Sequence, residues 1–169
     1  PHVLAPTVYG EQVFTGGGYY GGITYSFSTV EPTRLWATST GGVWDMFTPA
    51  VDDKYVYHYN GAALSLIDRN TGTKAAAITD PFGSASGYAY HGSPVIGGRN
   101  NVLAFAQGAF SGRASSSAEH YEQRVISSFN IDAKTYEWST PNAYLTTPAI
   151  ANGVIYAARN APMSLDAID

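Results

Sequence analysis

The sequence predicts an all-β protein made of about four consecutive copies of one short repeat. Three observations support this prediction. The 169 residues include 18 glycines and 13 tyrosines but only 13% charged residues, a composition that suits pleated strands and tight turns. One proline-initiated hairpin pattern recurs along the whole chain. No apolar stripe with the 3.6-residue period of a helix extends over a helical length.

The first half of each repeat is a hairpin that begins at a proline. The prolines are Pro6, Pro49, Pro94 and Pro148, so successive copies are spaced by 43, 45 and 54 residues. Proline lacks an N–H and is tolerated best at the start of a strand. Apolar residues follow, then a turn such as Asn152-Gly153, which supplies the positive φ of a tight hairpin. We therefore expect four hairpins of one design.

The second half of the repeat is an apolar strand that ends in Ile-Asp and a turn. It occurs as LSLIDRNTGTK from Leu64, as SFNIDAKTYEW from Ser128 and as LDAID from Leu165. An aspartate at this place accepts backbone N–H groups in an Asx-turn. The expected structural turn residues are Asp68, Gly72, Asp132 and Asp169. The first copy keeps the strand and the closing Trp36 but has no such aspartate.

A third strand precedes this turn and a fourth follows it, at Arg34–Trp36 or Tyr136–Trp138. Each repeat therefore contains four short antiparallel strands in about 45 residues, the size of one β-propeller blade. We expect a single repeat domain with about four blades and an incomplete ring. The expected blades are 1–47, 48–92, 93–146 and 147–169, the last of them truncated inside its own motif.

Composition excludes several classes of function. The net charge of −4 comes without a basic stripe, so we expect no nucleic-acid partner. No apolar run reaches the roughly 20 residues of a membrane helix, so we expect no membrane span. The chain has no cysteine, which excludes disulfides and cysteine-based metal sites.

The order of these elements resembles a known repeat. A strand-initiating proline, a Gly/Asn hairpin, an Ile-Asp turn ending in Thr-Gly and a tryptophan are similar to the PQQ-like (quinoprotein alcohol dehydrogenase-like) β-propeller repeat. SLIDRNTGTK matches the signature, although Ala75–Ala77 replace the closing tryptophan; NIDAKTYEW keeps the tryptophan but has Tyr136 where glycine is usual. The resemblance covers essentially the whole chain as a pattern.

Complete propellers of this family are rings of seven or eight blades, so the resemblance implies part of a ring. The chain is then either a fragment or a small protein that closes its ring by association or with four blades. An open half-ring exposes unpaired edges, which promote aggregation. A stable half therefore requires a partner that covers its ends.

The resemblance also implies an alternative function, because the family includes enzymes that bind pyrroloquinoline quinone (PQQ) and Ca²⁺. The densest acidic pair, Asp52-Asp53, occupies a hairpin position and is interpreted as a turn rather than a metal site. We expect no catalytic residue, cofactor or metal in this segment; PQQ and Ca²⁺ belong to the alternative. His58 lies in a strand, on the face opposite its neighbouring tyrosines.

Two insertions, Gly108–Arg124 and Pro81–Gly92, are predicted to be surface loops, and loops often provide binding residues. The candidate ligand or partner contacts are Tyr19, Tyr20, Trp44, Tyr88, Tyr90, His91, Arg113 and His120. We expect a non-catalytic propeller segment that acts as a binding or assembly scaffold. Its partner would be a protein, the remaining half of the propeller, or a carbohydrate. The resemblance implies a secreted or periplasmic location. A quinoprotein dehydrogenase fragment and a carbohydrate-binding propeller are the alternatives.

Overall fold

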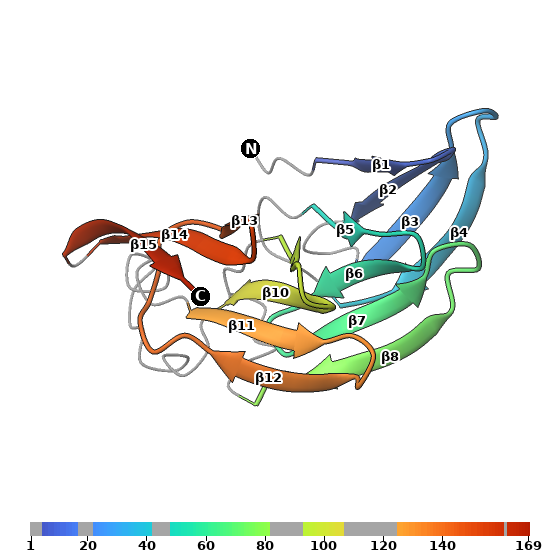
Figure 1. Cartoon of the computed structure of the whole chain (residues 1–169). Coiled ribbons are helices and arrows are strands. Elements are labelled where there is room, and N and C mark those ends of the chain that lie inside the picture. The colour runs from blue at the N-terminus through green and yellow to red at the C-terminus, as the bar shows by residue number, and fades with distance from the viewer. Residues whose placement is uncertain (1–4, 17–21, 42–47, 82–92, 107–124, 161) are drawn as a thin grey trace.

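The computed structural model describes residues 5–16, 22–41, 48–81, 93–106, 125–160 and 162–169. These residues form strands and no helix, and the strands build four antiparallel sheets that follow one another round an open arc (Figure 1). Within them, no helix has the length and apolarity needed to cross a bilayer. The predicted all-β propeller architecture with an incomplete ring is confirmed.

Every sheet is a meander, because strands that follow each other in the chain pair with each other. Sheet 1 consists of β1 (Thr7–Tyr9), β2 (Gln12–Gly16), β3 (Ile23–Ser28) and β4 (Arg34–Ser39). Sheet 2 consists of β5 (Ala50–Val51), β6 (Tyr55–Tyr59), β7 (Ala63–Asp68) and β8 (Lys74–Thr79). Sheet 3 consists of β9 (Val95–Ile96), β10 (Asn101–Ala106), β11 (Val125–Asn130) and β12 (Thr135–Ser139). Sheet 4 has three strands, β13 (Ala149–Ala151), β14 (Val154–Asn160) and β15 (Met163–Ile168).

The first strand of each repeat follows its proline and joins the second through a turn, which has two residues in sheets 1 and 4 and is longer in sheets 2 and 3. In sheet 4, Asn152 and Gly153 form a two-residue turn, and their φ angles are 53° and 79°. A two-residue turn with positive φ at both residues has a twist that matches the twist of the flanking strands. Adjacent first strands lie close together on the inner side of the arc, where the Thr7 hydroxyl donates to the Pro49 carbonyl at 2.6 Å. The prolines therefore mark the inner strands of the ring.

The core lies between successive sheets rather than inside any one of them. Each of the three interfaces has its own cluster of buried side chains: Phe14 and Val56 between sheets 1 and 2, Tyr59 and Phe129 between sheets 2 and 3, and Phe105 and Ile155 between sheets 3 and 4. Fully burying one such side chain stabilises the fold by roughly 1.5–3 kcal/mol. Sheets 2 and 3 are therefore covered on both faces, and sheets 1 and 4 on one.

A β-bulge at the same place in three sheets fixes which residues are equivalent. The register between third and fourth strands shifts at Ser26/Phe27, at Leu66/Ile67 and at Ser128/Phe129. In this alignment Trp36, Ala76 and Trp138 occupy one position on the fourth strand.

The turn cap agrees with the sequence prediction in sheet 2 and differs from it in sheet 3. Asp68 Oδ1 accepts the N–H groups of Asn70 and Thr71 at 3.1 and 2.8 Å, as an Asx-turn requires. In sheet 3 the equivalent residue is Asn130, whose Oδ1 accepts the N–H of Ala133 at 2.9 Å, and not Asp132, which lies two residues later within the turn.

The first copy, which has no aspartate here, uses Ser28 instead, and its hydroxyl oxygen accepts two turn N–H groups at 3.1 Å. Asp, Asn and Ser thus cap the same turn in different sheets, because each has an oxygen acceptor on a short side chain.

Candidate functional site

The eight contact residues predicted from loops lie outside the described residues: Tyr19, Tyr20, Trp44, Tyr88, Tyr90, His91, Arg113 and His120. The insertion Gly108–Arg124, and all of Pro81–Gly92 except Pro81, lie outside them as well. The geometry of a candidate site therefore comes from the four sheets themselves.

Asp52 and His58, whose side chains are of types that bind metals, both make contacts within the fold. Asp52 Oδ1 accepts the N–H groups of Lys54 and Tyr55 at 2.8 and 2.7 Å, so this carboxylate closes a hairpin. His58 is buried, and its Nδ1 lies 3.2 Å from the Thr24 hydroxyl across the interface of sheets 1 and 2. Across the described residues, no three His, Asp or Glu side chains come together as a metal site would need.

A tryptophan of sheet 1 packs on a turn of sheet 2. The indole Nε1–H of Trp36 donates to the Arg69 carbonyl at 2.9 Å, and the Thr38 hydroxyl donates to the Gly72 carbonyl at 2.5 Å. Gly72 has φ of +73°, and a Cβ built there would lie 2.7 Å from the indole ring. The glycine thus lets the turn backbone rest directly on the ring.

Trp138 has the same position in sheet 3, but its surroundings differ. Trp138 is 37% exposed, whereas Trp36 is 8% exposed. Trp138 lines a hollow of about 250 Å³ between sheets 3 and 4, together with Arg99, Asn101 and Glu137. No hydrogen bond from its indole N–H is present among the described residues. The hollow therefore combines an aromatic wall with an available donor.

Polar side chains form part of the lining of this hollow. The amide of Asn101 donates to Ser128 at 2.9 Å, and the Ser128 hydroxyl donates to Glu137 Oε2 at 2.7 Å. At the mouth, Arg99 Nη2 lies 3.2 Å from Asp169 Oδ1, and both side chains are exposed. An exposed ion pair of this kind contributes little stability, so it opens at low cost when another group enters.

A second hollow runs along the free edge of sheet 4. Its volume is about 590 Å³, and it is lined by 140–144, the segment after β12, and by 165–169 at the end of β15. No strand of the described residues pairs with the outer side of β15. An unpaired edge presents a row of backbone donors and acceptors to any extended chain.

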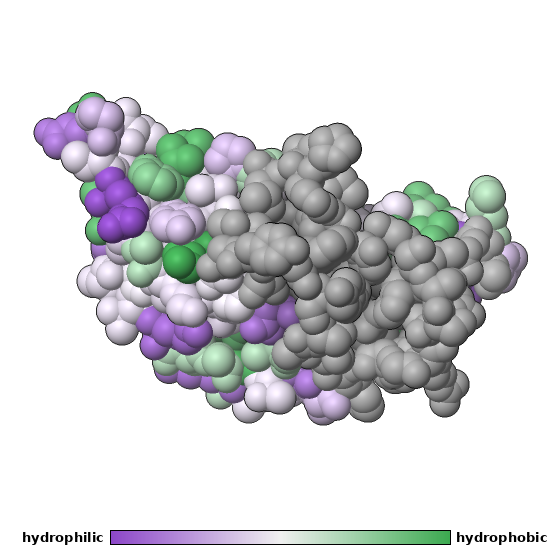
Figure 2. Space-filling model, turned by 180° about the vertical axis from the view of Figure 1, so that it is seen from behind, coloured by the Kyte–Doolittle hydropathy of each residue, from purple (hydrophilic) through white to green (hydrophobic). Residues whose placement is uncertain are grey.

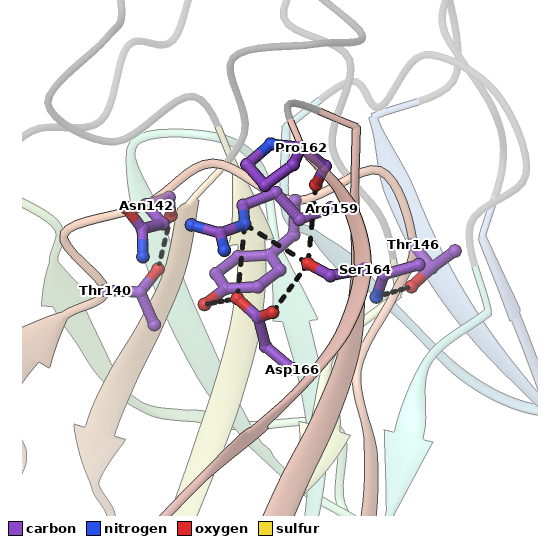
Figure 3. Close-up of polar contacts among 9 residues, drawn as sticks. Thr140, Asn142, Thr146, Arg159, Pro162, Ser164 and Asp166 are labelled. Carbon is purple, nitrogen blue, oxygen red and sulfur yellow. Dashed lines mark hydrogen bonds and ion pairs between the residues drawn. The ribbon is translucent and has the colours of Figure 1, made fainter.

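A polar cluster fixes the orientation of β15 at this edge (Figure 3). Arg159 Nε lies 3.3 Å from Asp166 Oδ2, and Ser164 donates to Asp166 Oδ1 at 2.8 Å. The Tyr144 hydroxyl donates to Oδ2 of the same carboxylate at 3.3 Å. These contacts hold Ser164 and Asp166 toward sheet 3, so the alternating side chain of Leu165 points away from it.

The cluster is arranged for rigidity rather than for proton transfer. Burial, followed by the negative charge of Asp166, raises the pKa of Tyr144, so its phenol keeps its proton to a higher pH than an ordinary tyrosine. The Ser164 hydroxyl proton points to a carboxylate that Arg159 already neutralises. This arrangement orders the strand edge.

Hydrophobic side chains are exposed on both end sheets, and Figure 2 shows hydrophobic surface at both ends of the molecule. Leu165 of sheet 4 is 71% exposed, although the equivalent Leu64 of sheet 2 is fully buried. Phe27 of sheet 1 is 37% exposed, although the equivalent Ile67 is fully buried. The end sheets therefore show the apolar faces that the inner sheets bury against each other.

Comparison with known proteins supports the fold. No family model matches the sequence, and no curated protein matches it. The structure is similar to the computationally designed Ika4 protein, with a TM-score of 0.69 and 10% identity over 99% of this chain and 92% of that one.

Two natural propellers are also similar. The Pan2 WD40 domain of Neurospora crassa matches with a TM-score of 0.64 and 13% identity, over 98% of this chain and 45% of that chain. BamB from Moraxella catarrhalis matches with a TM-score of 0.60 and 12% identity, over 91% and 44%. The chain is a β-propeller by fold, and it spans less than half the length of these two proteins.

The sequence alone did not indicate the edge of β15 or the hollow at Trp138 as a site. It identified Trp138 as the tryptophan that closes a repeat, but the surroundings of that tryptophan depend on the next sheet.

Proposed function

We propose that this chain is a non-catalytic β-propeller segment that works as an assembly scaffold, and that its two end sheets bind further propeller blades. The exposure of Leu165 and Phe27, at positions that the inner sheets bury, is the observation that supports this proposal. Apolar side chains exposed at positions that are otherwise buried mark an interaction surface.

The exposed faces of sheets 1 and 4 are complementary. Within the chain, the forward face of one sheet packs on the rear face of the next, as Leu64 and Leu66 do in the core between sheets 2 and 3. Sheet 4 exposes a forward face and sheet 1 exposes a rear face. A head-to-tail contact of this kind closes into a ring when the rotation fits. The greater length of the similar natural propellers supports a ring with more blades than these four.

Sedimentation velocity over a range of concentrations tests the proposal. We expect the purified chain, whose mass is 18.0 kDa, to self-associate through its end faces. Leu165→Glu places a charge in the contact and should return the chain to monomer. Val30→Glu is the matched control, because Val30 is 68% exposed in a turn and gains the same charge. Monomers at every concentration for the unaltered chain would contradict the proposal.

The repeat type is also proposed to be PQQ-like. The Asx-turn at Asp68 and the left-handed Gly72 support it, because these are the residues through which the sequence resembles that family. A secreted or periplasmic location is proposed on the same resemblance. Fractionation of the source cells with an antibody to this chain tests the location, and recovery in the cytosol alone would contradict it.

A further inference from the structure

Two Asn-Gly dipeptides occur in the sequence, at Asn60-Gly61 and at Asn152-Gly153. Asparagine is a thermolabile residue, because the backbone nitrogen of the next residue can attack its side-chain carbonyl carbon, Cγ. The attack is easiest before glycine, which has no side chain to obstruct it. Every other asparagine of the chain precedes a residue with a side chain. The two dipeptides are therefore the places at which the fold decides whether this reaction proceeds.

The surroundings of Asn152 permit the reaction. Asn152 is exposed, and with Gly153 it forms the two-residue turn between β13 and β14. Among the described residues, neither the side-chain amide of Asn152 nor the N–H of Gly153 has a hydrogen-bond partner. Strand pairing begins on either side of the turn, at Ala151 and Val154. Nothing in this part of the chain holds the amide away from the Gly153 nitrogen.

The surroundings of Asn60 prevent the reaction. Its Oδ1 accepts the N–H groups of Ala62 and Ala63, both at 3.0 Å, and its Nδ2 donates to the Thr40 carbonyl at 3.1 Å. Gly41 also packs on this amide, since a Cβ built at Gly41 would lie 2.9 Å from Nδ2. The attack requires the amide to turn and these hydrogen bonds to break. Because half-buried groups that lose their partners cost free energy, the folded chain protects Asn60.

We propose that Asn152 is a site of spontaneous covalent modification, in which the turn of sheet 4 converts to aspartate and isoaspartate, and that the fold protects Asn60 from the same reaction. The Gly153 nitrogen bonds to Cγ of Asn152, the Cγ–Nδ2 bond breaks, and Nδ2 leaves as ammonia with the proton of the glycine nitrogen. Water then opens the resulting succinimide ring at either of its two carbonyl groups. One opening restores the normal backbone with an aspartate. The other gives isoaspartate, in which the backbone runs through the side-chain carbons.

The isoaspartate product should loosen the inner strand of sheet 4. Its backbone contains an additional carbon atom, whereas a two-residue turn with positive φ at both residues joins its strands in one specific geometry. Beyond this turn β13 pairs with β14 through only three residue pairs. Ile150 of β13 packs against the buried cluster between sheets 3 and 4. The modification at the turn therefore also weakens the packing of sheet 4 on sheet 3.

The test ages the purified chain at mildly alkaline pH and maps its peptides by mass spectrometry, after chromatography that separates aspartate from isoaspartate. We expect Asn152 to deamidate at least tenfold faster than Asn60 in the folded chain. In urea sufficient to unfold the chain, the two sites should react at similar rates, because both precede glycine and the hydrogen bonds of Asn60 are broken. Equal rates in the folded chain, or a reaction of Asn152 that occurs only in urea, would overturn the proposal.

Hydrogen exchange tests the effect on the strand. The isoaspartate form, isolated from the aged chain by chromatography, should exchange the amides of β13 faster than the fresh chain does. Asn152→Asp is the matched control, because it has the new charge on a normal backbone, and we expect it to exchange like the unaltered chain. Equal exchange of β13 in the isoaspartate form and in Asn152→Asp would contradict the loosening of the strand.

Discussion

Substitution of Gly72 measures how strongly the contact between the first two sheets stabilises the propeller. Gly72→Ala has two costs. A residue with a Cβ at φ of +73° costs roughly 1–2 kcal/mol in the left-handed region. The new Cβ would also lie 2.7 Å from the Trp36 ring, and overpacking of a filled interface costs about 1–3 kcal/mol. We expect a total loss of about 2–5 kcal/mol.

Gly10→Ala is the matched control. Gly10 has φ of +57°, but a Cβ there meets no atom within 4 Å, so only the conformational cost of roughly 1–2 kcal/mol remains. Urea unfolding at a constant denaturant slope gives both free energies. The difference of about 1–3 kcal/mol between the two variants isolates the contact with the ring.

A third variant checks the cause. In a Trp36→Ala background the ring is absent, so Gly72→Ala should cost no more than Gly10→Ala. The coupling between positions 36 and 72 should therefore be similar to the difference between the single glycine variants. Equal costs for Gly72→Ala and Gly10→Ala in the unaltered chain would show that the ring contact has no energetic importance.

Three further predictions concern burial and pH. Leu64→Ala should cost about 2–5 kcal/mol in urea unfolding and Leu165→Ala less than about 1 kcal/mol, because only Leu64 is buried; equal losses under monomeric conditions would contradict this difference. Hydrogen bonds from Thr71 lower the pKa of Asp68 below its ordinary 3.8, so its stabilising contribution is complete above that pH and lost as pH falls through the folded pKa. Between about pH 5 and about pH 2.5, which lie on either side of the reference pKa, the urea midpoint of Asp68→Asn should fall less than that of the unaltered chain. Parallel pH profiles of the two chains would contradict this prediction. Burial, then the charge of a neighbouring carboxylate, raises the pKa of Tyr59 well above 10.0, so its contribution is lost as pH rises above 10.0, and Tyr59→Phe should flatten alkaline destabilisation.

The architecture could be predicted from the sequence because its signals are local. A proline at the start of a strand, a turn pair such as Asn152-Gly153 and an alternating apolar strand each act over a few residues. Their repetition four times over then defines the sheets, without knowledge of any long-range contact. The strands after Pro6, Pro49 and Pro148 accordingly form where the pattern predicts them.

The turn in sheet 3 shows where local signals become ambiguous. The sequence matches Ile131-Asp132 to Ile67-Asp68, but the structure aligns Asn130 with Asp68. A shift of two residues leaves every side chain on the same face of a strand, so the apolar pattern cannot detect it. Asp, Asn and Ser all cap such turns, so residue type does not distinguish the two registers either.

The candidate site could not be predicted for a different reason. Trp36 and Trp138 have equivalent places in the repeat, and what distinguishes them is the residue that the next sheet brings against the ring. That residue belongs to another sheet, and the alignment that identifies it depends on the β-bulges. A fourfold pattern describes what the copies share and does not show which side chains of neighbouring sheets meet.

Binding and folding should therefore be linked at the end sheets. In a repeat protein each sheet is stabilised mainly by its neighbours. Sheets 2 and 3 have a neighbour on both faces, whereas sheet 4 has one covered face and β15 has one paired edge. A ligand that pairs with β15 stabilises the folded chain by RT ln(1 + [L]/Kd), about 2.7 kcal/mol at one hundred times the dissociation constant. Because the edge strand gains most from that energy, hydrogen exchange of β15 should slow more on binding than that of β7, whose amides are already enclosed by sheets 1 and 3. Equal protection of the two strands would mean that the ligand binds elsewhere.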